Sequence, residues 1–204
     1  MVPVLLGLLV VGAIASLVTV VQRRPERPPV IDAFTLGEPW RRHVAAAQTA
    51  QRRYREIAAG TPPGPLRDRL GDIELQVQRA VQECFGIARS GDDLDDALSR
   101  FNSASLTTQL AGTDDDITRA SLQSQLDSAA RIRSRRDDTD GRLRLLTTRM
   151  GELVAQAAEV SVGTDSTESL GTGVDDVVTQ MEALRLALAE MNGNGGTGPP
   201  TTSS

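Results

Sequence analysis

The sequence contains no lysine, one cysteine, one histidine and very few aromatic residues. Aromatic residues make up 2% of the 204 residues: one Trp, one Tyr and three Phe. This is too little aromatic volume for the thick core of an α/β enzyme, whereas long helices that meet along narrow seams of Leu, Val and Ala need less apolar volume. A single cysteine also excludes a disulfide within the chain. The composition therefore indicates an all-α protein.

The charge of −5 is unevenly distributed along the chain. Residues 23–60 hold eight arginines and four acidic residues, a net charge of +4, and residues 61–204 hold fourteen arginines and twenty-three acidic residues, a net charge of −9. A nucleic-acid-binding protein would carry its basic surface on the folded body. Because the body here is acidic, we expect no nucleic-acid partner.

Residues 2–21 form an uninterrupted apolar run without a charged residue. Twenty helical residues span about 30 Å, the thickness of the hydrocarbon core of a bilayer. Arg23, Arg24 and Arg27 follow the run, and positive flanks stay on the cytoplasmic side. This predicts a single-pass plasma-membrane anchor with the N-terminus outside and the body cytoplasmic. The alternative is a signal peptide cleaved after Ala15, although its positive charge would then stand on the wrong side of the apolar run.

The next residues predict a spacer and a first helix. Residues 22–37 contain three prolines and no helical period, which is typical of an extended, semi-rigid spacer. A helix over residues 38–60 has two interpretations. Trp40, Arg41 and Arg42, together with the arginines after the anchor, could contact anionic lipid. We favour the other interpretation, in which the apolar side chains of this helix pack on the next one.

A second helix has the clearest pattern in the chain. Steps of four and three residues join Leu66, Leu70, Ile73, Val77, Ala80, Cys84 and Ile87. We expect Ser90 and Gly91 to end this helix and a short helix to begin at Asp92 or Asp93 and to reach Phe101.

The rest of the body is predicted as two helices and their connections. After a polar stretch at 102–112, residues 114–162 are interpreted as one long helix with a solvated middle at 133–142; a break at Asp140-Gly141 is the alternative. Residues 163–173 predict a flexible connection, and the last helix covers 174–191. Residues 192–204 are of low complexity and predict a disordered tail.

The predicted fold is thus an N-terminal transmembrane helix followed by a body, residues 38–191, of long helices packed as an antiparallel coiled-coil-like bundle. The bundle can close within one chain or between two copies, and we favour a homo-oligomer because a helix over 114–162 would outrun its neighbours. The side chains expected to form the interaction seam are Leu66, Leu70, Ile73, Val77, Leu143, Leu146, Met150, Leu153, Val177, Met181, Leu184 and Leu188.

No residue pattern indicates catalysis. His43 has no second His or Cys near it in the sequence and is interpreted as a solvated surface residue. Cys84 lies in an apolar seam, where a thiol acts as a small hydrophobic group. Asp138 to Gly141 resemble the middle of a calcium loop, but the positions that need Asp and Glu hold Arg136 and Thr147. We therefore expect no enzyme activity, metal, cofactor or small-molecule substrate.

Three strings carry a resemblance: FTLGEPWRRHV (34–44), PGPLRDRL (63–70) and LQSQLDSAARIR (122–133). They are similar to a group of actinobacterial single-pass membrane proteins with a cytoplasmic coiled-coil body. The resemblance covers most of residues 34–190 and implies an architecture and a bacterial plasma membrane. It implies no activity.

These observations favour a membrane-anchored helical scaffold or protein-interaction protein, whose partners are the lipid bilayer and either another protein or a second copy. The alternative is a regulatory accessory subunit of a membrane signalling or transport complex.

Overall fold

A computed structural model of the protein describes residues 31–163 and 166–194. These residues form helices and contain no strand. A short 3₁₀ helix, η1 (Ala33–Thr35), precedes five α-helices: α1 (Trp40–Gly60), α2 (Pro65–Ser99), α3 (Ser103–Ala111), α4 (Asp116–Ser161) and α5 (Thr167–Asn194). The predicted all-α class is confirmed for this part of the chain.

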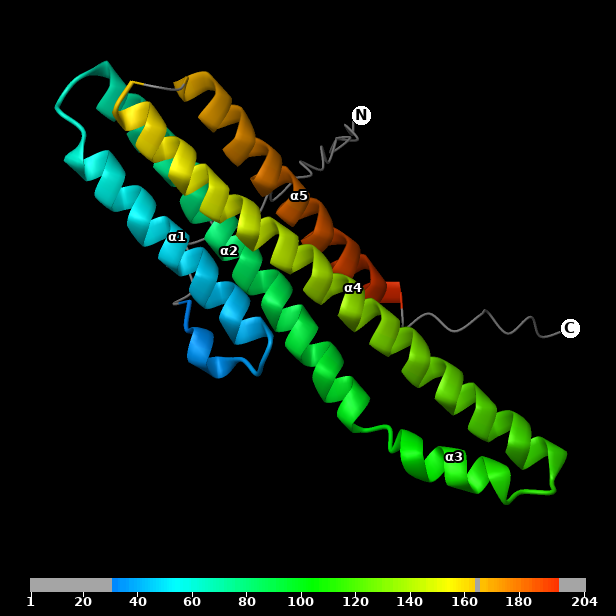
Figure 1. The fold of residues 1–204 in the computed structure, drawn as a ribbon. Helices are drawn as coiled ribbons and strands as arrows, with labels where there is room; N and C mark the ends of the chain where they lie inside the picture. Colours follow the sequence, from blue (N-terminus) through cyan, green and yellow to red (C-terminus); the bar gives the residue numbers. More distant parts are fainter. Residues whose placement is uncertain (1–30, 164–165, 195–204) are drawn as a thin grey trace, which may run out of the picture. The chain divides into compact units, whose positions relative to one another are not determined.

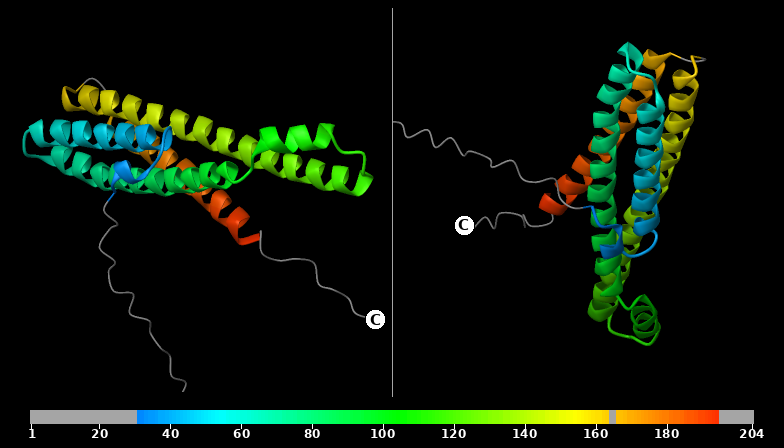
Figure 2. Two further views of the ribbon diagram at one scale, coloured as in Figure 1. Left: turned by 90° about the horizontal axis from the view of Figure 1, so that it is seen from below. Right: turned by 90° about the vertical axis from the view of Figure 1, so that its left-hand side faces the viewer.

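Four of these helices pack together with alternating direction (Figure 1). Helices α1 and α2 form an antiparallel hairpin, α4 returns beside both, and α5 runs back along α2 and α4. Helices α1 and α4 are therefore parallel to each other, as are α2 and α5. In the described part of the chain, α3 packs closely against α4 and against no other helix. It lies beyond the region where the four helices meet. The last turns of α5 diverge from α4 (Figure 2).

Local signals fix where the helices begin and end. Gly64 adopts a φ of 152°, which favours glycine, and Pro65 follows at the first position of α2. The side chain of Asn102 accepts a hydrogen bond from the backbone N–H of Ser105 at the start of α3, and Asp115 accepts one from Thr118 at the start of α4. Gly163, with a φ of 80°, follows the end of α4.

Helix α4 is continuous through residues 140 and 141, so the interpretation as one long helix is confirmed and the alternative break is wrong. Two other expected boundaries are also wrong. Helix α2 continues through Ser90 and Gly91 to Ser99, and α5 begins at Thr167 rather than at residue 174. In both places tertiary packing outweighs the local cost of glycine in a helix: Gly91 is buried, and Leu170 in the first turns of α5 is fully buried.

The polar stretch at 102–112 is also helical, since it contains α3 with Asn102 as its cap. Nine residues rarely form a helix alone in water, so packing on α4 stabilises α3. Leu122 and Ala129 of α4 are buried in this region but lie outside the main hydrophobic core. We call α3 together with residues 116–132 of α4 the arm.

The predicted spacer is described only from Ile31 onward. There the chain is not simply extended: residues 33–35 form η1, capped by the side chain of Asp32, and Ala33 and Leu36 are buried in the main core. The anchor predicted at residues 2–21 lies outside the described residues, as do residues 195–204 of the predicted tail. Among the described residues, no helix has the length and apolar character needed to cross a membrane.

Candidate functional site

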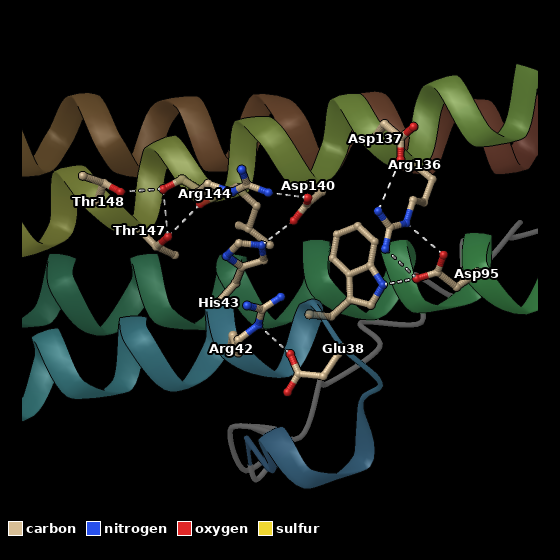
Figure 3. A network of polar contacts seen from close by, with 12 residues as sticks. Glu38, Arg42, His43, Asp95, Arg136, Asp137, Asp140, Arg144, Thr147 and Thr148 are labelled. Carbon is tan, nitrogen blue, oxygen red and sulfur yellow. Dashed lines mark hydrogen bonds and ion pairs between the residues drawn. The ribbon is translucent and has the colours of Figure 1, made fainter.

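The most elaborate polar arrangement in the described part of the chain lies where α1, α2 and α4 meet (Figure 3). Its apolar centre is Trp40, at the first position of α1, whose side chain is fully buried. The indole ring lies against Gly91 of α2: a Cβ atom placed on Gly91 would lie 2.4–2.5 Å from three carbon atoms of the ring. A glycine inside a long helix therefore makes room for the tryptophan.

Asp95 of α2 and Arg136 of α4 complete this side of the network. The indole Nε1–H of Trp40 donates to Asp95 Oδ2 at 2.7 Å, and Arg136 Nε donates to Asp95 Oδ1 at 2.9 Å. The guanidinium carbon of Arg136 also lies 5.4 Å from the centroid of the Trp40 ring, within the range of a cation–π interaction. One carboxylate thus connects α1 and α4 through α2.

His43 and Asp140 form the second half of the network, one turn further along α1. His43 is 7% exposed and Asp140 is 8% exposed, and His43 Nε2 lies 2.6 Å from Asp140 Oδ1. An ionised carboxylate only accepts hydrogen bonds, so we assign the proton to Nε2. The other oxygen of Asp140 accepts from Arg144 Nη2 at 2.7 Å. The interpretation of His43 as a solvated residue is wrong.

The middle of α4, residues 133–142, is mostly exposed as expected, but one side of it is not. Thr139 and Asp140 are buried, and Arg136 is only partly exposed. Burial by itself raises the pKa of the Asp140 carboxyl, but the hydrogen bond and charge of His43, with the charges of Arg144 and Arg136, more than offset this and hold the pKa below its ordinary value. The carboxylate is therefore stabilised as an anion between helices.

A buried His–Asp pair is also part of many hydrolytic sites, but there it activates a nucleophile. The neighbouring hydroxyl groups have other partners here. Thr139 Oγ1 donates to the Arg135 carbonyl oxygen, and Thr147 Oγ1 donates to the carbonyl oxygens of Leu143 and Arg144. Within residues 31–163 and 166–194 there is also no group of three His, Cys, Asp or Glu side chains that could hold a metal ion. Chemically, the arrangement joins helices.

No family model, curated protein or solved structure matches the chain. The resemblance to actinobacterial membrane proteins therefore remains a prediction.

The residues predicted as an interaction seam lie in the core of a single chain. Eleven of the twelve are buried, and Leu66 is partly buried against the same cluster: Leu70, Ile73, Val77, Leu143, Leu146, Met150, Leu153, Val177, Met181, Leu184 and Leu188. They come from α2, α4 and α5, which contact one another. These side chains are thus occupied by contacts within the chain; binding of another chain through them remains a prediction.

The six residues considered for contact with a membrane surface are separated by the structure. Arg23, Arg24 and Arg27 lie outside the described residues. Trp40 is buried in the network, as expected if α1 packs on α2. Arg41 Nε donates to the Leu36 carbonyl oxygen at 3.1 Å. Arg42 is largely exposed and pairs with Glu38 at 2.8 Å.

Sequence reasoning did not find Gly91, Asp95, Arg136 or Asp140 as members of a site. The Trp40–Asp95 bond joins residues 55 positions apart, and the His43–Asp140 bond joins residues 97 positions apart. One available signal was that Asp140 lies three residues before Leu143, where an apolar seam begins. This spacing places the carboxylate on the buried side of α4.

Proposed function

We propose that the protein is a membrane-anchored helical scaffold or protein-interaction protein of a bacterial plasma membrane, and that it is not catalytic. The proposal is supported mainly by the arm, which extends beyond the four packed helices (Figure 1). Helix α4 has 46 residues, or about 70 Å at 1.5 Å per residue. Only α3 covers its first turns closely, so much of the arm surface remains available to a partner.

The interior of the bundle is consistent with this role. The hollow among Tyr54, Val77, Met150 and Val177 has a volume of about 10 Å³, which is about the smallest space that holds one water molecule. The polar network described above connects α1, α2 and α4 and fixes their arrangement. These features support a rigid body that presents an arm.

The anchor is the second component of the proposal. If residues 2–21 span the bilayer, nine residues separate them from Ile31, where the described chain begins to pack on the bundle. Nine extended residues reach at most about 32 Å. The bundle would therefore stay close to the cytoplasmic surface, and its partners would be found in or beside the membrane.

Site-specific photo-cross-linking in native membranes tests this function. A cross-linking residue at Ser121 on the exposed surface of the arm is expected to capture a protein. The same residue at Leu75 of α2, which is 68% exposed, serves as the control and is expected to capture far less. Equal capture at both positions, or none at Ser121, would contradict the scaffold proposal.

The anchor is tested separately, by extraction of the full chain from membranes with alkaline carbonate. Replacing Leu9 and Val10 with arginine is expected to release the protein, since each arginine costs about 3 kcal/mol at the centre of a membrane helix. If carbonate releases the unmodified chain as well, there is no membrane-spanning anchor.

A further inference from the structure

The last turns of α5 diverge from α4 (Figure 2). A groove lies between these two helices, lined by residues 131–142 of α4 and residues 184–188 of α5. Its volume is about 640 Å³, and a second hollow of about 380 Å³ adjoins it. Helix α5 contributes apolar side chains, among them Leu184 and Leu188, and α4 contributes Arg131, Arg135 and Arg142. The groove thus combines apolar walls with a basic edge.

The positive charge of this edge is only partly neutralised. Among the charged side chains that line the groove, three are arginines and one is Asp138, a net charge of +2. Asp138 pairs with Arg142 at 2.9 Å, and Arg131 Nη2 donates to the hydroxyl of Ser128 at 2.9 Å. Within the described residues, Arg135 forms no ion pair. An occupant with exposed acidic groups and an apolar side chain would suit this edge.

The far end of the same helix has these properties. Asp114, Asp115 and Asp116 lie at the beginning of α4, and the next residue, Ile117, is 82% exposed. The side chain of Asp116 is 91% exposed, and its one ion pair among the described residues is with Arg119 of its own helix. This tip is acidic and apolar where the groove is basic and apolar.

The tip and the groove lie on one face of α4. Steps of four and three residues connect the residues of this face, which are Ile117, Ser121, Ser124, Ser128, Arg131, Arg135, Asp138 and Arg142. Seven of them are exposed and Ser128 is partly exposed. The packed residue Leu122 of the arm points in a different direction on the helix, about 140° from Ile117 at 100° per residue. Contact with a partner along this face would leave α3 in place.

The distances match an antiparallel pair of α4 helices. From a point between residues 127 and 128, Ile117 lies about 16 Å away in one direction, and the middle of residues 131–142 lies about 14 Å away in the other. A two-fold axis through this point therefore brings Ile117 of each copy to the groove of the other copy. The serines between them are small, so the two helices can approach closely.

We propose that the groove between α4 and α5 binds the acidic tip of α4 from a second copy of this chain, so that two chains form a two-fold symmetric dimer through their arms. This rests on the proposed function and names its partner. The axis places Asp116 of each chain level with residue 139 of the other, between Arg135 and Arg142 and about 5–6 Å along the helix from each. Ile117 packs on the apolar wall of the groove beside the exposed Ala187. Since both contacts form at once, the interface is closed and does not extend into a filament.

Disulfide cross-linking of the full chain in membranes tests the alignment. Ser128→Cys places the two thiols of the dimer beside the two-fold axis, about 2 Å apart along the direction of α4. Ser121→Cys places them about 20 Å apart in the same direction. A disulfide needs Cα atoms within about 7 Å. We expect mild oxidation to cross-link S128C and not S121C, with the unmodified chain as a background, since its Cys84 is buried. Cross-linking of S121C as readily as S128C, or of neither, would overturn the proposed dimer.

The contacts are tested in the full chain purified in detergent, with dimer dissociation measured by sedimentation. Ile117→Glu and Arg135→Glu are each expected to weaken the dimer at least about tenfold, as at the centre of an interface. The matched control Leu75→Glu, also at an exposed apolar position, is expected to change it less than about twofold. Restoration of the dimer when Asp116→Arg is added to Arg135→Glu supports the charge pairing. Unchanged dissociation in Ile117→Glu overturns the proposed dimer.

Failure of this proposal is distinguishable from failure of the proposed function. If photo-cross-linking at Ser121 captures a different protein and S128C forms no dimer, the scaffold remains and its partner is not a second copy.

Discussion

The contact between Gly91 and Trp40 can be tested by adding a single methyl group. A Cβ atom on residue 91 would lie 2.4 Å from one carbon atom of the indole ring and 2.5 Å from two others. Ordinary van der Waals contact begins near 3.4 Å, so the ring must move by about 1 Å. It cannot do so freely, because its Nε1–H donates to Asp95 at 2.7 Å and Arg136 lies over its face.

Two opposing effects set the change in the free energy of unfolding that Gly91→Ala causes. Alanine in place of glycine inside a helix stabilises by about 1 kcal/mol. Overpacking of a core costs about 1–3 kcal/mol, and a weakened hydrogen bond to a charged acceptor costs about 1.5–3 kcal/mol more. We expect Gly91→Ala to lower the free energy of unfolding by about 1.5–5 kcal/mol after the helix gain is subtracted.

Urea denaturation followed by circular dichroism measures this difference. Gly141→Ala is the matched control, because Gly141 lies in α4 and a Cβ there would meet no atom within 4 Å. The control is expected to be stabilised by up to about 1 kcal/mol. Trp40 is the single tryptophan, so its fluorescence reports directly on the contact. If Gly91→Ala is as stable as Gly141→Ala, the reasoning on this contact is wrong.

Two further predictions concern buried groups. Asp140→Asn is expected to destabilise the protein by about 1–3 kcal/mol near neutral pH, because His43 and Arg144 lose a charged partner. Since the pKa of Asp140 is below its ordinary value, its stabilisation is present above about pH 4 and is lost as the pH falls through the lowered pKa; urea titrations in which the difference between the two proteins does not shrink in acid would contradict this. Burial raises the pKa of Cys84 to about 12, so iodoacetamide is expected to label the native protein slowly and the unfolded protein fast. Equal labelling rates in the two states would argue against a buried thiol.

Apolar periodicity predicted the long helices because each has one face in the core. The stripe through Leu70, Ile73 and Val77 is buried as a helix of this spacing requires. The same reasoning ended α2 at Gly91, since glycine is an ordinary helix-stop signal, and its true partner, Trp40, is 51 positions away. Whether a glycine ends a helix or makes room for a ring depends on the neighbouring element, which local pattern does not contain.

The polar network could not be predicted for a similar reason. His43 follows two arginines and Asp140 lies in a run of charged residues, so both have the local surroundings of solvated residues. Their burial depends on α1 and α4 lying side by side, which brings together residues 97 positions apart. The pairing of helices had to be known before the pairing of these charges.

Apolar stripes alone leave the axial register of packed helices ambiguous. If one helix slides along its neighbours by one heptad, about 10 Å, it again presents apolar side chains to them. The indole of Trp40 and the imidazole of His43 do not repeat in this way. After such a shift Ala47 and Ala50 would face the half-buried Asp95 and the buried Asp140 and could offer them no hydrogen bond. An uncompensated buried carboxylate costs several kcal/mol. We expect these polar contacts to select a single axial register of α1 against α2 and α4.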